Sequence, residues 1–380
     1  MHDLLRQEVA ATADLVVVKV GTRVLTGANG LLDRERVASL AEELHQILGG
    51  GRRVVLVTSG AVGAGMGQLG LKKRPTDLAH LQAVAAVGQA HLVEAYDQCL
   101  RQHGRHAAQL LLTADDLDHR TRYLNVRNTL RTLMEYGAVP IINENDTVAV
   151  DELMTTFGDN DRLAAMVANL LRAPLLVLLS DVDGLYDGDP RDPASKLIHT
   201  VTELDASITS LVRDVGPGLG KGGMASKLSA ARLVTAAGEN CVIAGGRTPG
   251  NLARILAGET VGTLFVPRGS AVQSRKRWIG YTAQPRGKLV LDAGAARAVV
   301  EQGRSLLAIG ITAVEGAFSK GDVVAVCTAE GIELARGLTN YSSSDVEKIK
   351  GLKSDAIAAT LSHRPYEEVI HRDNMALTGK

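Results

Sequence analysis

The sequence predicts an α/β protein with one large domain built on a mainly parallel sheet, followed by a small β-rich domain. Two observations predict the large domain: short apolar runs recur along residues 1–265, and helical patterns separate them. A change of character predicts the small domain, since helical patterns become sparse after residue 275 and short β-like runs replace them. We therefore expect a linker at 266–274, a β-rich domain at 275–365 and a C-terminal tail at 366–380.

The composition narrows the classes of function. The formal net charge is +0 at pH 7, and aromatic residues make up only 3% of the sequence. Both values argue against a protein whose main activity is to bind nucleic acid by charge or by base stacking. Cys99, Cys241 and Cys327 lie far apart without a Cys-x-x-Cys motif, a pattern typical of a reducing cytoplasm. No secretory signal is visible, and the longest apolar run, residues 174–179, is too short for a membrane span. We expect a cytoplasmic protein.

The first predicted strand, residues 14–20, is buried on both faces because its β-branched residues are nearly continuous. Lys19 is its polar exception and stands at the carboxyl end of the strand. Ligands of open α/β sheets bind off those ends, so Lys19, with Gly21 and Thr22 after it, is a candidate site residue. A lysine that reaches solvent is the alternative. A helical pattern follows at residues 32–48.

The second predicted strand, residues 54–57, ends in a glycine-rich turn that contains Thr58, Ser59 and Gly60. Such a turn offers hydroxyl groups and backbone N–H groups to an anion. One turn of this kind is weak evidence, but two on the same sheet would strengthen the interpretation.

The middle of the large domain contains a long helix and two further strands. The helix is predicted at residues 76–100, and Gly88 within it indicates close packing. Strands are predicted at 107–112 and 139–142, with the acidic residues of 115–120 forming a solvated helix start between them.

Amides and carboxylates gather after the strand that ends at Ile142. They occupy residues 143–147 and 157–161, and a helix is predicted at 162–171. Capping of that helix explains one acid at its start but not the whole set. Asp146 and Asn160 are suited to bind an amine or an amide, so the site suits a zwitterionic substrate.

A fifth strand, residues 175–179, ends in Ser180 and Asp181. The turn-rich segment that follows, residues 187–193, is expected to be a surface excursion. A strand at 241–244 completes the pattern of the large domain.

The stretch at residues 216–227 combines many glycines with Lys221 and Lys227, directly before a helix predicted at 225–237. Glycines let several N–H groups converge on one anion, and the helix start adds to that field. A polyphosphate is the simplest ligand, although a plain surface loop has the same composition. The stretch is not a P-loop, because Gly-Lys comes one residue too early and Gly222 stands where Ser or Thr would bind magnesium.

The small domain shows β-like runs at 288–291, 323–327 and 332–337. Arg275-Lys276-Arg277-Trp278 forms a basic cluster at its start, for which a solvated linker is the favoured interpretation over an RNA contact.

Taken together, these motifs resemble the bacterial glutamate 5-kinases, which belong to the amino acid kinase family. The blocks that carry the resemblance are, in order, Lys19-Val20-Gly21-Thr22, Thr58-Ser59-Gly60-Ala61-Val62, Asn143-Glu144-Asn145-Asp146, Gly158-Asp159-Asn160-Asp161 and residues 220–227. The C-terminal part, with Ser319-Lys320-Gly321-Asp322 inside it, resembles a PUA domain. The resemblance covers nearly all of the chain and implies a three-layer αβα sandwich.

The resemblance also implies a role for each site residue. Lys19 would contact the ATP phosphates, Ser180 and Asp181 would lie near the nucleotide, and the glutamate would be held by Ser59, Asp146 and Asn160. The phosphates would be wrapped by Lys221, Gly222, Gly223, Met224, Ala225, Ser226 and Lys227. The family often has Thr where Lys221 stands and Ser-Thr where Ala225-Ser226 stand. We expect Lys19 and Lys227 to flank the transferred phosphoryl group and Asp161 to orient both lysines.

The implied activity is ATP-dependent phosphorylation of the γ-carboxylate of L-glutamate, the first step of proline synthesis. ATP is the co-substrate, Mg²⁺ bridges its phosphates, and no dedicated protein metal site is expected. Proline as a feedback inhibitor, glutamate-5-semialdehyde dehydrogenase as acceptor of the product and a homo-oligomeric state are further implied. Open alternatives are a kinase for N-acetylglutamate, aspartate, carbamate or UMP, an RNA-binding protein that acts through the PUA-like domain, and a non-catalytic sensor.

Overall fold

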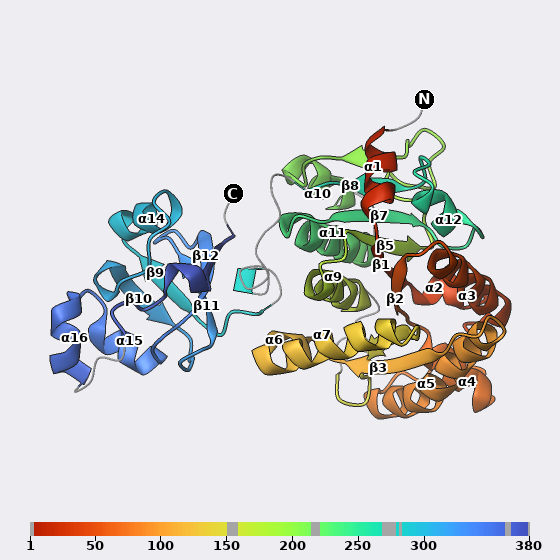
Figure 1. The fold of residues 1–380 in the computed structure, drawn as a ribbon, viewed down its shortest axis with the longest axis horizontal. Helices are drawn as coiled ribbons and strands as arrows, with labels where there is room; N and C mark the ends of the chain where they lie inside the picture. Colours follow the sequence, from red (N-terminus) through yellow and green to blue (C-terminus); the bar gives the residue numbers. More distant parts are fainter. Residues whose placement is uncertain are drawn as a thin grey trace. The chain divides into compact units, whose positions relative to one another are not determined.

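The computed structural model describes residues 4–149, 159–213, 221–267, 279–280, 283–361 and 366–378. The chain forms two compact units, Met1–Ala271 and Val272–Lys380 (Figure 1). Four parts of the sequence predictions lie outside the described residues: 157–158, 216–220, residues 268–274 of the expected linker, and the basic cluster at 275–278.

The N-terminal unit alternates strands and helices. Its strands are β1 (Leu15–Val20), β2 (Arg53–Val57), β3 (Ala107–Leu112), β4 (Val139–Glu144), β5 (Leu175–Ser180), β6 (Thr200–Val201), β7 (Asn240–Gly245) and β8 (Thr263–Phe265). Its helices are α1 (Leu4–Thr12), α2 (Thr22–Leu25), α3 (Arg34–Gly49), α4 (Ala61–Gln68), α5 (Leu78–Arg101), α6 (Ala114–Asp118), α7 (Arg120–Glu135), α9 (Asp159–Leu171), α10 (Ala206–Arg213), α11 (Lys221–Ala236) and α12 (Asn251–Leu256).

These strands form one sheet in the order β3-β4-β2-β1-β5-β7-β8-β6. Among the described strands the neighbours run parallel, except that β8 is antiparallel to β7. The strand β1 is central, with β2 on one side and β5 on the other. The carboxyl ends of β1, β2, β4 and β5 therefore meet at one edge of the sheet, where ligands of open α/β sheets bind.

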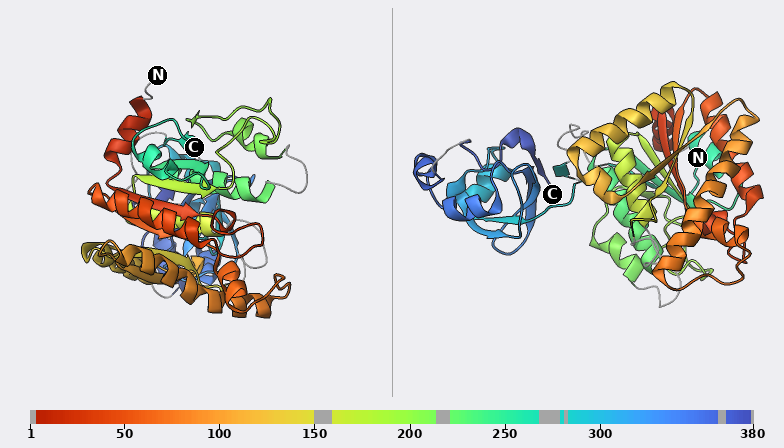
Figure 2. Two further views of the ribbon diagram at one scale, coloured as in Figure 1. Left: turned by 90° about the vertical axis from the view of Figure 1, so that its right-hand side faces the viewer. Right: turned by 90° about the horizontal axis from the view of Figure 1, so that it is seen from below.

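Helices cover both faces of the sheet, so the predicted three-layer αβα sandwich is confirmed. The helices α7, α9 and α11 contact one face, and α3 and α5 contact the other, with α4 and α12 packed against them. The strands run between the two layers in the right-hand view of Figure 2. In β1, Val16, Val18 and Val20 join the core with α3 and α5. Because side chains alternate along a strand, Lys19 points to the opposite face, toward α9 and α11.

One element of the site differs from the sequence prediction. The helix expected at 225–237 begins at Lys221, so residues 221–224 form the first turn of α11 where a loop was expected. The first N–H groups of a helix have no intrahelical partner, whichever residue carries them. The same groups therefore remain available to a ligand.

The C-terminal unit has a mixed sheet in the order β10-β9-β11-β12-β13, in which β9 and β11 are parallel. Its strands are β9 (Lys288–Leu291), β10 (Ile311–Glu315), β11 (Val323–Cys327), β12 (Glu333–Leu338) and β13 (Met375–Leu377), and its helices are α14 (Ala293–Val300), α15 (Ser343–Ile349) and α16 (Ser354–Leu361), with short 3₁₀ turns η2 (Ala308–Gly310) and η3 (Arg372–Asn374). The strand β13 pairs with β12, so part of the expected C-terminal tail belongs to this sheet. This unit has a hydrophobic core of its own.

No helix in the described part of the chain is both long and apolar enough to span a membrane.

Candidate active site

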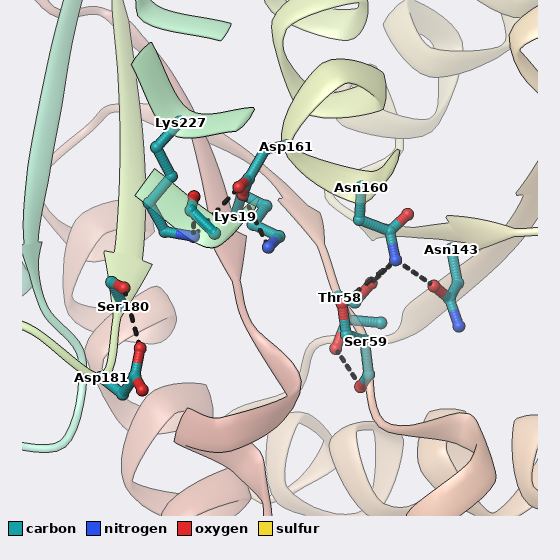
Figure 3. A network of polar contacts seen from close by, with 10 residues as sticks. Lys19, Thr58, Ser59, Asn143, Asn160, Asp161, Ser180, Asp181 and Lys227 are labelled. Carbon is teal, nitrogen blue, oxygen red and sulfur yellow. Dashed lines mark hydrogen bonds and ion pairs between the residues drawn. The ribbon is translucent and has the colours of Figure 1, made fainter. Parts of the chain in front are cut away.

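The candidate site lies at the sheet edge where the parallel strands end. Lys19 is the next-to-last residue of β1, Ser180 is the last residue of β5, and Ser59 follows the end of β2. The helices α9 and α11 supply Asp161 and Lys227 from their first two turns. Residues far apart in the sequence therefore share one location (Figure 3).

The centre of the site is a carboxylate held between two lysines. Lys19 Nζ lies 2.7 Å from Asp161 Oδ1, and Lys227 Nζ lies 3.0 Å from Asp161 Oδ2. Lys227 Nζ also donates a hydrogen bond of 3.3 Å to the carbonyl oxygen of Gly223, in the first turn of α11. Each lysine is thereby fixed by a charge-assisted hydrogen bond to a different oxygen of the same carboxylate.

Burial strengthens the two ion pairs of Asp161. Asp161 is fully buried, and Lys19 and Lys227 are 5% and 9% exposed. Burial alone would raise the pKa of Asp161, but the two ammonium groups hold that pKa below its usual range. Burial lowers the pKa of Lys227. The negative charge of Asp161 opposes this shift, and the positive charge of Lys19 adds to it. The cluster as a whole carries an excess of positive charge at the base of the site.

A network of amides and hydroxyls lies beside the lysines. Asn160 Nδ2 is 3.1 Å from each of three oxygens, the carbonyl of Thr58, the hydroxyl of Ser59 and Oδ1 of Asn143. Asn143 Nδ2 in turn donates to Gln89 Oε1 of α5 at 2.8 Å. These side chains are buried, so the network fixes the position of Asn160 and Ser59. Figure 3 shows Asn160 at its centre.

Asp146 follows β4 and lines the same cavity as this network. Burial raises the pKa of its carboxyl to about 6, although Arg74 opposes the shift. A partly desolvated carboxylate of this kind gains most from a cationic group on a ligand.

The opposite end of the site surrounds Ser180 and Asp181. The Ser180 hydroxyl donates to Asp181 Oδ1 at 3.2 Å, and Arg23 of α2 donates to Asp181 Oδ2 at 3.0 Å. Burial tends to raise the pKa of Asp181, but the hydrogen bond from Arg23 helps to hold that pKa below its usual value. Gly188 to Arg191 also line the cavity, so the segment expected to be a surface excursion forms part of this wall.

The glycine-lysine stretch meets the site through α11. Gly223, Met224 and Lys227 line the cavity. Ala225 and Ser226 lie in the same helix, with Ala225 exposed. The backbone of Lys221 and Gly222 begins the helix, whereas the side chain of Lys221 lies outside the described residues.

The cavity that these residues enclose has a volume of about 420 Å³. That is within the usual range for small-molecule sites. It extends from Asp146 and Asn160 at one end, past Lys19 and Asp161, to Asp181 and the 182–191 segment at the other. The space suits two substrates that meet at the lysines.

The sequence prediction did not include four polar residues of the site. Asn143 belongs to a motif noted in the sequence but had no role, and Gln89 is one amide on the inner face of a long helix. Arg23 and Arg74 lie in segments without a motif. Only the fold brings these residues to the cavity or its network.

Comparison with known proteins agrees with this architecture. Residues 14–245 match the amino acid kinase family and residues 287–361 match the PUA domain. A glutamate 5-kinase from Rhodopirellula baltica is 52% identical over 373 residues, which cover 98% of this chain and 96% of that protein. A glutamate 5-kinase from Citrifermentans bemidjiense is 47% identical over 98% of this chain and 100% of its own length.

Among solved structures, carbamate kinase from Giardia lamblia bound to AMP-PNP covers 68% of this chain and 100% of its own, with a TM-score of 0.48 and 19% identity. The family match spans the sheet and the helices that build the site, and the full-length relatives share both units. The chain therefore belongs to the amino acid kinase family, with a PUA domain after the kinase domain.

Proposed function

We propose that this protein transfers the γ-phosphoryl group of ATP to the γ-carboxylate of L-glutamate, giving L-glutamyl 5-phosphate and ADP, the first step of proline synthesis. The observation that carries the proposal is the Lys19–Asp161–Lys227 cluster, which places two ammonium groups in one cavity between the Ser180–Asp181 end and the amide-rich end. The full-length similarity to glutamate 5-kinases supports the choice of substrate.

The reaction needs positioning and cations more than proton transfer. An ionised carboxylate is already a nucleophile at pH 7, so a general base is unnecessary. One γ-carboxylate oxygen forms a bond to the γ-phosphorus of ATP, the bond from that phosphorus to the β,γ-bridging oxygen breaks, and ADP leaves with the electron pair. The difficulty is that an anion attacks a more negative phosphate, so catalysis depends on alignment and charge neutralisation.

In this proposal Lys19 and Lys227 supply that neutralisation from two sides of the transferred group. Asp161 holds both ammonium groups in place, which would limit the reorganisation needed during the reaction. The free N–H groups in the first turn of α11 add partial positive charge where the phosphate oxygens would lie.

The amide-rich end would hold glutamate. Ser59 would donate its hydroxyl hydrogen to the acceptor carboxylate while Asn160 Nδ2 donates to that hydroxyl oxygen, and Asp146 would offer its carboxylate to the ammonium group. The fixed network through Asn143 and Gln89 supports this assignment, because it keeps Asn160 and Ser59 in place without the substrate.

The other end would hold ATP, with Ser180, Asp181 and the stretch from Lys221 to Lys227 near the nucleotide. Mg²⁺ would be bound mainly by the ATP phosphates, and it would neutralise charge on them. Asp181 would have a supporting role, because its carboxylate lines the cavity and is paired with Arg23, whereas Asp161 is buried between two lysines. Among the described residues, no group of three or more His, Cys, Asp or Glu side chains is arranged to hold a metal without the nucleotide.

The test is a substrate panel with the purified chain, ATP, magnesium chloride and hydroxylamine. L-glutamate should give a hydroxamate and an equal amount of ADP, because hydroxylamine traps the acyl phosphate. N-acetylglutamate, aspartate, carbamate and UMP should give ADP only at the background rate. Turnover of one of these, without turnover of L-glutamate, would refute the proposal.

The same proposal implies an inhibitor of the enzyme and a partner that accepts its product. The glutamate end could accept a smaller amino acid, so proline should compete with glutamate. The short-lived product should be passed to glutamate-5-semialdehyde dehydrogenase. A titration in which a high concentration of proline leaves the rate unchanged would refute inhibition by proline.

A further inference from the structure

The cavity contains one cation whose purpose the reaction centre does not explain. Arg74 lines the cavity in the segment before α5, at the end that holds Asp146. Its side chain is exposed, and within the described part of the chain it forms no hydrogen bond or ion pair. It is close enough to Asp146 to act on the charge of that carboxylate.

The other cations that line the cavity are already engaged. Lys19 and Lys227 both bind Asp161 at the reaction centre. Arg23 pairs with Asp181 at 3.0 Å, and Arg191 pairs with Asp189 at 2.6 Å, both at the nucleotide end. Among the cavity-lining cations that the structure describes, Arg74 is therefore the one left available at the end that holds Asp146.

The proposed substrate has a group that still needs a partner. L-glutamate carries an ammonium group and an α-carboxylate on one carbon, besides the γ-carboxylate that reacts. Asp146 suits the ammonium group, and Ser59 and Asn160 suit the γ-carboxylate, which leaves the α-carboxylate without a cation. A guanidinium group is well matched to a carboxylate because it can donate two parallel hydrogen bonds.

We propose that Arg74 binds the α-carboxylate of the substrate, so that Arg74 and Asp146 together form a subsite for the zwitterionic head of a free α-amino acid. This inference rests on the proposed function, since it assigns a part of the same substrate. Arg74 would set specificity and affinity, whereas Lys19, Asp161 and Lys227 carry out the transfer.

The electrostatics of the free site favour this assignment. Asp146 and Arg74 form no direct ion pair, so an incoming ligand does not have to break one. Burial makes the ionised form of Asp146 costly, and a ligand ammonium group would offset that cost. A molecule with one positive and one negative group on the same carbon would satisfy both side chains at once.

The same logic predicts which analogues the subsite rejects. N-acetylglutamate replaces the ammonium group with a neutral amide, which would leave Asp146 without a counter-charge. Glutarate lacks the ammonium group, and 4-aminobutyrate lacks the α-carboxylate while its amine occupies the position of the glutamate amine. These two analogues therefore probe Asp146 and Arg74 separately.

The experiment compares Arg74→Gln with Lys72→Gln and Lys73→Gln in the full-length chain. The two control lysines are exposed neighbours that do not line the cavity, so they report the general effect of removing a positive charge. We expect Arg74→Gln to raise the KM for L-glutamate about 10- to 100-fold with kcat nearly unchanged, the effect of losing one charge-assisted contact. Arg74→Lys should recover part of the loss.

The analogues are measured as competitive inhibitors of the wild type and of Arg74→Gln. Inhibition by glutarate should weaken by a factor similar to that for L-glutamate, and inhibition by 4-aminobutyrate should stay the same. An unchanged KM for L-glutamate in Arg74→Gln, or unchanged inhibition by glutarate, would overturn the assignment. If inhibition by both analogues weakens equally in Arg74→Gln, the assignment would also be overturned, because such a result would indicate a structural effect of the substitution. If the wild type fails to phosphorylate L-glutamate, the proposed function fails instead, and this is visible before any variant is made.

Discussion

Lys19, Asp161 and Lys227 illustrate how one buried carboxylate can organise two cations. Without Asp161 the two ammonium groups would repel each other in a site of low solvent access, and burial already lowers the pKa of Lys227. The carboxylate stays ionised because both lysines hold its pKa below the usual range. The pairs are therefore formed at neutral pH, before any substrate arrives.

Replacement of Lys227 tests its place at the reaction centre. We expect Lys227→Ala to lower kcat by about 100-fold or more, in the range of single-donor losses at such sites. The fold should persist, because Lys19 still pairs with Asp161. Steady-state kinetics and a thermal unfolding curve measure the two effects.

Lys196→Ala is the matched control, since Lys196 is exposed and does not line the cavity. Near-normal turnover by Lys227→Ala, with the control also normal, would show that this lysine is not part of the reaction centre.

Asp146 gives the site a dependence on pH. Burial raises the pKa of this carboxyl to about 6, so the free enzyme loses its negative charge as the pH falls through that value. We expect kcat/KM for L-glutamate to fall about tenfold per pH unit below about pH 6, because the substrate ammonium then loses its partner. Asp146→Asn should be less active throughout and should lack this inflection.

The loss of activity at low pH can be distinguished from acid unfolding, because protonation of Asp146 changes the two quantities in opposite directions. The pKa of Asp146 is higher in the folded chain than in the unfolded chain, so protonation of Asp146 favours the folded state between its ordinary pKa and about 6. The melting temperature should therefore not report a loss of stability from this residue in that range. A flat kcat/KM profile from pH 5 to pH 8 would contradict the assignment.

At the scale of elements, the helices α4 and α5 show why the turn that carries Ser59 is held in place. The turn passes through Gly60, whose φ of 97° favours glycine, directly into α4. A Cβ at Gly88 of α5 would lie 1.8 Å from the carbonyl oxygen of Ala61 and 2.3 Å from the amide nitrogen of Gly65. The two helices therefore approach at the start of α4, next to the glutamate end of the site.

Gly88→Ala should separate these helices. We expect a loss of about 2 kcal/mol or more in the free energy of unfolding, since the added methyl overlaps backbone atoms that cannot move independently. The KM for L-glutamate should rise as well, because the turn with Ser59 begins α4. Urea unfolding and kinetics at a permissive temperature measure both.

Gly67→Ala is the control for Gly88→Ala, because the added methyl group meets no neighbouring atoms. Gly67 lies in α4, and nothing comes within 4 Å of a Cβ added there. That substitution should stabilise the protein by up to about 1 kcal/mol through helix propensity. If both variants lose the same stability, the close approach at Gly88 is not the cause.

The sequence predicted the elements that have a strong periodic pattern. The strand Ala107–Leu112 and the strands Lys288–Leu291 and Val323–Cys327 have the predicted bounds. Val323–Cys327 is buried throughout, so its apolar run is unambiguous. The other two strands are only partly buried, but short apolar runs mark them. The prediction of close packing at Gly88 is confirmed by its contacts with α4.

Elements without such a pattern were missed. A helix start was predicted at residues 115–120, but the length of α7 was not, because this helix carries many charges and buries only Tyr123 and Leu130. The strands β6 and β13 are two and three residues long and owe their existence to pairing partners far along the chain. The first turn of α11 was taken for a loop because of its glycines.

The same distinction applies to the site. Lys19 was predicted because it interrupts a buried apolar strand at its carboxyl end, and Lys227 because it stands in the glycine-rich stretch before a helix. The role of Asp161 came from the resemblance to the amino acid kinase family. Their assigned roles remain predictions. Asn143 and Gln89 could not be paired from the sequence, because the hydrogen bond between them depends on how α5 packs beside the sheet.

At the scale of the whole molecule, the two units have separate hydrophobic cores. Within the described chain, one core includes residues from Val9 to Leu264 and the other includes residues from Leu289 to Met375. The described side chains of the candidate site all belong to the N-terminal unit. A unit with its own core and its own site should fold and work without the other.

A chain that ends at residue 267 tests this independence. We expect it to fold and to phosphorylate L-glutamate with a kcat within about tenfold of the full-length value, because the sheet edge and both lysine-bearing elements are retained. Far-UV circular dichroism and thermal unfolding establish whether the shortened chain is folded, and the hydroxamate assay gives its rate. A folded but inactive shortened chain would mean that the PUA domain contributes directly to catalysis, and the site would then be incomplete in the N-terminal unit.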